Sequence, residues 1–294
     1  MIATYLDKYA KHILIIPSLL IIIVLIVYPS IYLVRMCFSE YDLTYMPAPE
    51  FNGLENFKLL VKDQYFWSAL FNTLIISITA VTLEFVLGLS LSLLVESTSK
   101  GANLFKSIFI ISMMIPPIVI GLNFKLIYDQ FGPLNSLAQA FGFGTIGWLS
   151  TPFMARISIV LADVWQWTPF MFIIILAGLQ AVNPEYYDAA RVDGARGLQL
   201  FRFVTWPMIL PAVTVAIAFR VIDSLKIFDI IFMVTWGGPS GATETLSLYI
   251  YRTAFRFGNL GYAATLAFVM LALLSIVITI FLKLIGLSKR MEWT

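Results

Sequence analysis

Six long apolar segments recur along this sequence, and each is long enough to cross a lipid bilayer. A membrane-spanning helix needs about 20 predominantly apolar residues. With 60% hydrophobic and 12% charged residues, the chain is too apolar for a soluble globular protein. The sequence therefore predicts an all-α polytopic membrane protein, a single transmembrane domain over residues 1–294. We place its six transmembrane helices at residues 13–36, 68–95, 106–128, 157–179, 208–233 and 263–284.

The first apolar segment could also be a signal peptide, because Lys8 and Lys11 precede it. However, Ile13 to Val34 is a run of 22 uncharged residues, which is longer than the apolar region of a signal peptide. No small-residue cleavage site follows it. We therefore interpret this segment as the first span.

The single cysteine and the single histidine bound the chemistry of the chain. Cys37 alone excludes an internal disulfide and is expected to fill apolar space. His12 has no second histidine or cysteine cluster near it, so we predict no metal site. A net charge of +2 without a basic block gives no indication of nucleic-acid binding.

The basic residues favour one orientation in the membrane. An even number of spans puts both termini on one side. That side would hold ten lysines and arginines against seven on the other, which favours cytoplasmic termini. The ten are Lys8, Lys11, Lys100, Lys106, Arg191, Arg196, Arg202, Lys283, Lys289 and Arg290, and the seven are Arg35, Lys58, Lys62, Lys125, Arg156, Arg252 and Arg256.

A polar island, Asn183 to Pro211, separates the fourth and fifth apolar segments. Its density of charge excludes it from lipid, so the loop at about residues 180–207 must be exposed to solvent. Asn183 is a predicted N-cap with Pro184 at the first helical position, and Gly194 can adopt the positive φ that ends a helix. A second short helix is predicted to follow and to end near Pro207.

Charged residues also occur inside predicted spans, where each costs several kcal/mol unless paired or hydrated. Glu84 is alone in the second span, and we expect it to form a hydrogen bond between helices. In the fifth span, charges recur every three residues and could form a structural ladder of ion pairs. Alternatively, part of this span faces a substrate pathway, with Arg220, Asp223, Ser224 and Ile227 as its stripe. The four charges are Arg220, Asp223, Lys226 and Asp229.

The fourth span offers a second candidate surface for a ligand. Gln166, Trp167 and Phe170 lie on adjacent turns and could share one face. Aromatic residues near a membrane surface are often interfacial anchors. They can also stack on pyranose rings while an amide binds hydroxyl groups. Both interpretations remain open from the sequence.

Local signals predict several breaks and turns. Ile115-Pro116-Pro117 should kink the third span. Short helices are expected over Leu54–Val61 and within residues 134–154, and Trp236-Gly237-Gly238-Pro239 should form a tight turn.

The polar island also resembles a known signature. Asp188-Ala189-Ala190, then Gly194, Val204 and Pro207 at their spacing, resemble the EAA motif of permease subunits of binding-protein-dependent ABC importers. The departures are Asp188 in place of Glu, and Val204 and Trp206 in the last part of the motif. Further segments resemble the carbohydrate branch of this family, the maltose and glycerol-3-phosphate permease type. They are Gly178-Leu179-Gln180-Ala181-Val182, Asp193-Gly194-Ala195, Phe201 and Thr235-Trp236-Gly237-Gly238-Pro239. The resemblance runs from about Pro17 to the last span and is densest between Trp148 and Ala263.

This resemblance implies the type I ABC importer permease fold with a cytoplasmic coupling helix. The function it implies is ATP-driven uptake of a sugar. The sugar would be an oligosaccharide, which could be acidic, or a related polyol or glycerol phosphate. Coupling to the ATPases would use Asp188, Ala189, Ala190, Asp193, Gly194, Val204 and Pro207. The substrate pathway would use Gln166, Trp167, Phe170, Arg220, Asp223, Ser224 and Ile227.

The resemblance also implies the partners of the chain. They are a second, similar permease subunit, two ATP-binding cassette subunits and an extracytoplasmic solute-binding protein, in a bacterial or archaeal inner membrane. The sequence holds no G-x-x-x-x-G-K-[ST] motif, so ATP and Mg would be bound by the partner subunits, and no cofactor or catalytic residue is expected in this chain.

Two other functions are consistent with a polytopic chain. An ion-coupled secondary transporter would use intramembrane acids, for which Glu84 and Asp223 are candidates, but it would leave the polar island unexplained. An intramembrane enzyme would need a clustered nucleophile and base, or metal ligands, and the sequence shows none. Arg220 adds the hypothesis of an acidic sugar, because a guanidinium binds carboxylates. That hypothesis fails if Asp223 already neutralises Arg220.

Overall fold

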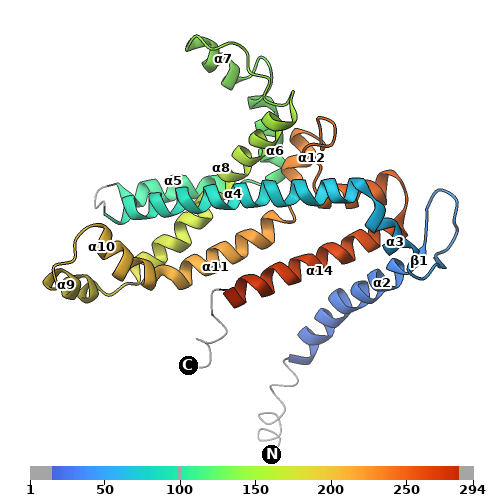
Figure 1. Ribbon diagram of the computed structural model, residues 1–294, viewed down its shortest axis with the longest axis horizontal. Helices are drawn as coiled ribbons and strands as arrows, with labels where there is room; N and C mark the ends of the chain where they lie inside the picture. The colour runs from blue at the N-terminus through green and yellow to red at the C-terminus, as the bar shows by residue number, and fades with distance from the viewer. Residues whose placement is uncertain (1–14, 98–100, 285–294) are drawn as a thin grey trace, which may run out of the picture. The chain divides into compact units, whose positions relative to one another are not determined.

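The computed structural model describes residues 15–97 and 101–284, which are mostly helical (Figure 1). Five helices are long and apolar enough to cross a membrane, and a bent pair of helices makes a sixth candidate span within these residues. The predictions made for Lys8, Lys11, His12, Lys100, Lys289 and Arg290 concern positions outside the described residues. The candidate spans are Ile15–Cys37, Gln64–Glu96, Ala102–Met114 with Pro117–Ile127, Pro152–Gln180, Leu198–Ser224 and Leu260–Phe281.

The described chain forms two compact units. The residues up to Gln64 together with Ile250–Ala272 form the first unit, and Tyr65–Tyr249 together with the residues from Leu273 form the second. The first unit contains η1 (Ile23–Val27), α2 (Tyr28–Cys37), β1 (Ser39–Glu40), β2 (Glu50–Phe51), α3 (Glu55–Lys62), η3 (Arg252–Arg256) and the first half of α14 (Leu260–Leu284).

The first unit is built around the end of α2. β1 and β2 pair antiparallel, with Ser39 opposite Phe51, a detail that the all-helical prediction did not include. The side-chain amide of Asn56 on α3 donates to the backbone oxygens of Cys37 and Ser39 at 3.1 and 2.9 Å. Cys37 is fully buried against Ala264 of α14, which agrees with its predicted role as an apolar filler.

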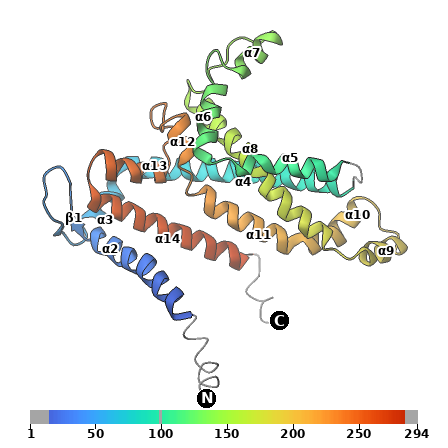
Figure 2. The ribbon, with the colours of Figure 1, turned by 180° about the vertical axis from the view of Figure 1, so that it is seen from behind.

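The second unit holds the long helices that matter for function. It contains α4 (Gln64–Glu96), α5 (Ala102–Met114), α6 (Pro117–Ile127), α7 (Pro133–Ala140), α8 (Pro152–Gln180), α9 (Pro184–Val192), α10 (Leu198–Leu200), η2 (Phe201–Thr205), α11 (Trp206–Ser224), α12 (Asp229–Val234) and α13 (Leu246–Tyr251). α8 packs on both α11 and α5, and α12 packs on α6. The views from both sides show α9 and α10 at the end of α8 and α11 that lies away from α12 (Figure 1, Figure 2).

The predicted break in the third span is confirmed. α5 ends at Met114, Ile115 is extended, and α6 begins at Pro117, with a bend of 95° between the two helices. The side-chain amide of Gln166 on α8 donates to the freed carbonyl of Ile115 at 3.2 Å. A polar backbone group at this depth is therefore satisfied by protein, as the apolar surroundings require.

Two predicted helix boundaries are wrong. The helix that begins at Leu198 continues through η2 and α11 to Ser224, because Pro207 stands in the first turn of α11, where its missing N–H costs nothing. The predicted fifth span, 208–233, is interrupted at residues 225–228, and α12 begins at Asp229. Lys226 consequently does not lie on the helix that carries Arg220.

Gly88 allows α4 and α8 to approach closely. A Cβ at this position would lie 2.7 Å from the Cβ of Met171 and 3.0 Å from the backbone N of Phe172. We expect Gly88→Val to separate the two helices and to destabilise the protein by roughly 1–3 kcal/mol, as overpacking generally does. Thermal unfolding of the detergent-purified subunit measures this. Ser90→Val is the control, since Ser90 is exposed two residues later on the same helix; equal melting temperatures for the two variants would contradict the prediction.

Candidate functional site

A buried arginine joins three long helices of the second unit. Arg220 on α11 is only 1% exposed. Its Nε and Nη2 donate to the two carboxylate oxygens of Glu84 on α4 at 2.6 and 2.8 Å. Nη2 also donates to Asp163 on α8 at 2.8 Å, and Nη1 donates to Asp223, one turn along α11, at 2.7 Å. We refer to Glu84, Asp163, Arg220 and Asp223 as the arginine cluster.

The geometry of the cluster explains how these charges exist inside an apolar bundle. A planar guanidinium matches a carboxylate with two parallel hydrogen bonds, as it does here with Glu84. Every guanidinium nitrogen of Arg220 donates to a carboxylate. The predicted interhelical bond of Glu84 and the predicted Arg220–Asp223 pair are both confirmed. The other half of the possible ladder is absent, because the structure shows no ion pair between Lys226 and Asp229 among the residues it describes.

The hypothesis that Arg220 binds an acidic sugar fails on the condition set for it. Asp223 already pairs with Arg220, and Glu84 and Asp163 do so as well. A ligand carboxylate would have to displace one of these three partners. Arg220 therefore pairs with carboxylates from three helices and does not present an unpaired guanidinium.

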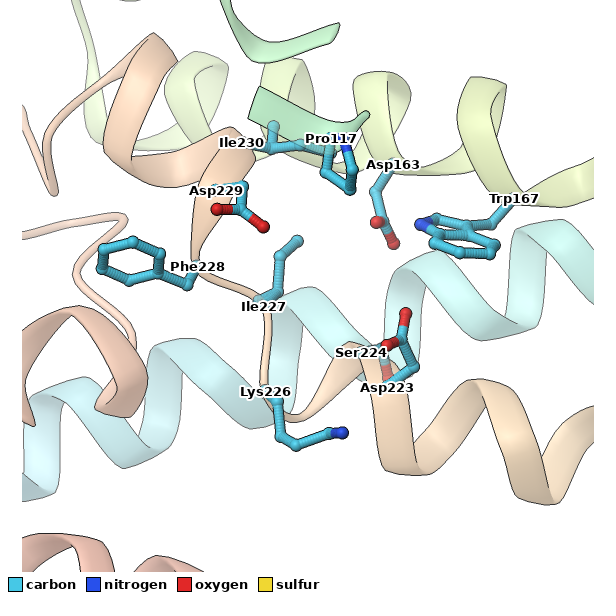
Figure 3. Close-up of a pocket in the computed structure, with 10 residues that line it drawn as sticks. All are labelled: Pro117, Asp163, Trp167, Asp223, Ser224, Lys226, Ile227, Phe228, Asp229 and Ile230. Carbon is cyan, nitrogen blue, oxygen red and sulfur yellow. The ribbon is translucent and has the colours of Figure 1, made fainter. Parts of the chain in front are cut away.

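A small cavity lies next to the arginine cluster (Figure 3). Its volume is about 90 Å³. Figure 3 shows Asp163 and Asp229 among the lining side chains, with the indole of Trp167 beside Asp163. Segments from four elements line it: Pro117 opens α6, Asp163 and Trp167 come from α8, Asp223 and Ser224 end α11, and Lys226, Ile227, Phe228, Asp229 and Ile230 form the break and the start of α12.

The cavity gathers four of the seven residues predicted for the pathway, namely Trp167, Asp223, Ser224 and Ile227. Gln166 does not share this face, because it is fully buried and bonds to Ile115 instead. Phe170 packs edge-on against Trp167, with ring centroids 6.3 Å apart, but does not line the cavity. Trp167 is held from behind by Arg220, whose guanidinium carbon lies 4.9 Å from the ring centroid.

Three charged lining residues were not among the predicted site residues: Asp163, Lys226 and Asp229. The signal for Asp163 was available, because an acid inside an apolar span needs a cation, and Arg220 is the buried cation of the neighbouring helix. Lys226 and Asp229 line this cavity because the interruption of the fifth span places Lys226 in the break and Asp229 at the start of α12. Helical periodicity alone does not predict that interruption.

The predicted coupling segment forms an exposed helix. α9 has no buried residue. As predicted, the Asn183 side chain caps it by accepting from the N–H of Glu185 at 3.0 Å, and Gly194 ends it with φ of +84°. Asp188 pairs with Arg191 at 2.9 Å, although both side chains are more than half exposed, so the pair adds little stability.

One polar contact holds this helix to the bundle. The hydroxyl groups of Tyr187 on α9 and Thr205 in η2 lie 3.2 Å apart. Val204 precedes that contact and Pro207 follows it in the first turn of α11. Ala189, Asp193 and Gly194 are exposed, and Ala190 is half-buried. The seven residues predicted for coupling therefore gather on one segment at the end of α8 and α11.

A third polar assembly fixes the turn after α12. The side-chain amide of Asn72 on α4 donates to the carbonyls of Gly241 and Glu244 at 2.9 and 3.1 Å. Arg156 on α8 donates to the carbonyl of Ala242 and to the side-chain oxygen of Asn72, both at 2.9 Å. Gly237, with φ of +85°, confirms the predicted tight turn at the start of this loop.

The described residues contain no group of three or more His, Cys, Asp or Glu side chains arranged to hold a metal ion. The carboxylates of the arginine cluster are directed at a guanidinium instead.

The chain matches known transport proteins over most of its length. Residues 84–291 match the family described as binding-protein-dependent transport system inner membrane component. The trehalose/maltose transport system permease protein MalF of Thermococcus litoralis is 36% identical over 258 residues, which cover 87% of this chain and 86% of that protein. The sulfoquinovosyl glycerol transport system permease protein SmoG of Agrobacterium fabrum is 34% identical over 280 residues, or 95% and 91% of the two chains.

Solved structures show the same fold. A chain of a bacterial ABC transporter involved in the import of the acidic polysaccharide alginate superposes with a TM-score of 0.84, at 20% identity, over 97% of this chain and 98% of that one. A chain of the MetNI methionine ABC transporter superposes with a TM-score of 0.56, at 18% identity, over 78% and 96%. The predicted fold, that of an ABC importer permease, is confirmed. By its match over residues 84–291 and by these relatives, the chain belongs to the family of binding-protein-dependent transport system inner membrane components.

Proposed function

We propose that this chain is the permease subunit through which an ABC importer moves a sugar across the inner membrane. The observation that carries the proposal is the cargo shared by its relatives, since proteins 36% and 34% identical over most of the chain are named for trehalose/maltose and sulfoquinovosyl glycerol transport. The import is alternating access driven by ATP, and the chemistry of ATP hydrolysis belongs to other subunits.

The segment around α9 is the docking site for an ATP-binding cassette subunit. Its exposure supports this role, because no residue of α9 is buried and Val192 and Leu198, which flank the Gly194 turn, are 88% and 78% exposed. Exposed apolar side chains beside polar ones are typical of a surface that binds another protein. The docking surface consists of Asp188, Ala189, Ala190, Asp193, Gly194, Val204 and Pro207, and closure of the ATPases pushes this segment.

The cavity beside the arginine cluster is part of the sugar pathway. Trp167 supplies an aromatic face, and Asp223, Ser224 and Asp229 supply polar groups, the composition of a site for a hydroxylated ligand. Its volume of about 90 Å³ is smaller than that of a complete ligand site. Such sites usually measure roughly 300–1,000 Å³. A second, similar permease subunit completes the pathway. Gln166, Phe170 and Arg220 support the lining residues from behind.

The remaining assignments follow from this function. The complex contains two ATP-binding cassette subunits, which bind ATP and Mg, and an extracytoplasmic solute-binding protein that delivers the sugar. Both termini of this chain are cytoplasmic, and its two units act within one membrane domain. An ion-coupled transporter would need a titratable acid that is free to exchange ions, whereas its two candidates, Glu84 and Asp223, are both paired with Arg220.

The test is ATPase activity in proteoliposomes. The chain is co-purified with its partner permease and ATPases and assayed with its binding protein, either empty or loaded from a panel of sugars. We expect one loaded form to stimulate ATP hydrolysis several-fold over the empty form. The proposed function would be contradicted if no ATPase subunit co-purified with the chain. It would also be contradicted if empty and loaded binding protein gave equal rates of ATP hydrolysis.

A further inference from the structure

The charges around the cavity are unequal in number and in accessibility. Four carboxylates lie in or directly behind its wall: Asp223 and Asp229 at the surface, Asp163 beside Trp167, and Glu84 behind Arg220. Two cations, Arg220 and Lys226, oppose them. The described residues that line the cavity include three carboxylates and one cation.

The two cations differ in what they can offer a ligand. Arg220 is 1% exposed and does not line the cavity, and four of its five N–H groups already donate to carboxylates. Lys226 is exposed, and Figure 3 shows it on the opposite side of Ile227 from Asp229. An anionic ligand in the cavity would therefore face three lining carboxylates and one lining cation, Lys226.

The acids have free capacity for hydrogen-bond donors. Asp223 uses one oxygen, Oδ2, for Arg220, and its side chain is 51% exposed. Asp229 forms no ion pair among the described residues and lines the cavity (Figure 3). An ionised carboxylate only accepts hydrogen bonds, and sugar hydroxyl groups are donors that suit it.

We propose that this cavity selects a neutral, hydroxyl-rich sugar and rejects sugars that carry a carboxylate, sulfonate or phosphate. The proposal rests on the proposed function and names the substrate class of the same site. Asp223 and Asp229 accept hydrogen bonds from sugar hydroxyls, while the face of Trp167 packs on the ring. The surplus of carboxylates acts as the repulsive element that discriminates against anions, since like charges repel.

Saturation-transfer difference NMR of the complete importer in lipid nanodiscs tests the selection without the binding protein. The probes are matched pairs of neutral and anionic sugars: glucose with glucuronic acid, and trehalose with trehalose 6-phosphate. We expect saturation transfer to at least one neutral sugar and binding at least about tenfold weaker for both anionic probes.

Three variants assign the signal to this cavity and to its charge. Trp167→Ala should abolish the signal of the neutral sugar. Asp229→Asn should reduce the difference between the neutral and anionic probes. Glu96→Gln is the control, because it removes the same charge from an exposed position at the end of α4 that does not line the cavity. It should leave the difference unchanged.

The outcomes separate this proposal from the proposed function. Anionic probes that bind as well as neutral ones would overturn the selection, above all if Lys226→Gln removed their signal. A neutral-sugar signal that survives Trp167→Ala, or no signal from any sugar, would also overturn it, even where a loaded binding protein still stimulates ATP hydrolysis. Loss of that stimulation, by contrast, would count against the importer function itself.

Discussion

Replacement of Arg220 by methionine is expected to destabilise the protein more than any other single change. The variant leaves Glu84 and Asp163 buried without their cation, at 0% and 2% exposure. Breaking a buried ion pair by removing one partner typically costs about 3–5 kcal/mol, because the remaining charge is uncompensated. We expect a large fall in the thermal midpoint of the purified subunit and little folded protein in the membrane fraction.

Two comparisons distinguish this effect from a general loss of positive charge. Lys226→Met removes an exposed cation six residues later and should change stability by less than about 0.5 kcal/mol. The triple variant Glu84→Gln, Asp163→Asn, Arg220→Met replaces the charges by neutral groups and should recover part of the stability. If Arg220→Met unfolded at the same temperature as Lys226→Met, the cluster would not hold the three helices together.

Replacement of Gly194 by proline is expected to uncouple the importer while the chain still inserts. Gly194 has φ of +84°, and its N–H donates to the carbonyl of Arg191 at 3.0 Å. Proline fixes φ near −65° and has no N–H, so it cannot adopt this turn. The end of α9 must then move, and because the coupling segment lies outside the bundle core, the helices of the bundle keep their packing. We expect uptake and stimulated ATPase activity to fall at least about tenfold. A small displacement of the docking surface removes the contacts with the ATPase that differ between the two conformations of the importer.

The chain offers a closely matched control for this change. Gly142, at the end of α7, has φ of +81°, has open space around its Cβ position, and donates its N–H to Gln139 at 2.9 Å. Gly142→Pro therefore causes the same local damage at a different place and should retain ATPase coupling. Normal uptake by Gly194→Pro, or equal loss in both variants, would remove the basis for the coupling role of α9.

Local chemistry explains what could be predicted from the sequence. Apolar length defined the spans, and the ends of α9 followed from the side chain of Asn183 and the backbone freedom of Gly194. The break at Ile115 followed from the two prolines after it. Each of these signals acts within a few residues, so a single sequence contains it in full.

The errors concern contacts between helices. Periodicity within the fifth span put Lys226 and Asp229 on one ion ladder, but the chain leaves the helix after Ser224, whose carbonyl accepts from Ser77 on α4 at 2.9 Å. Arg220 looked available to a ligand because Glu84 and Asp163 lie 136 and 57 residues away in the chain. Tertiary packing brings these acids to Arg220, and packing of that kind leaves no local pattern.

The bond from Gln166 to the carbonyl of Ile115 imposes an order of events on biosynthesis. The third span emerges from the ribosome with a proline break whose carbonyl has no donor within its own helix, and lipid offers none. The donor belongs to the fourth span, which is synthesised about fifty residues later. The bend of the third span therefore has its polar backbone group satisfied by protein only when the fourth span packs against it.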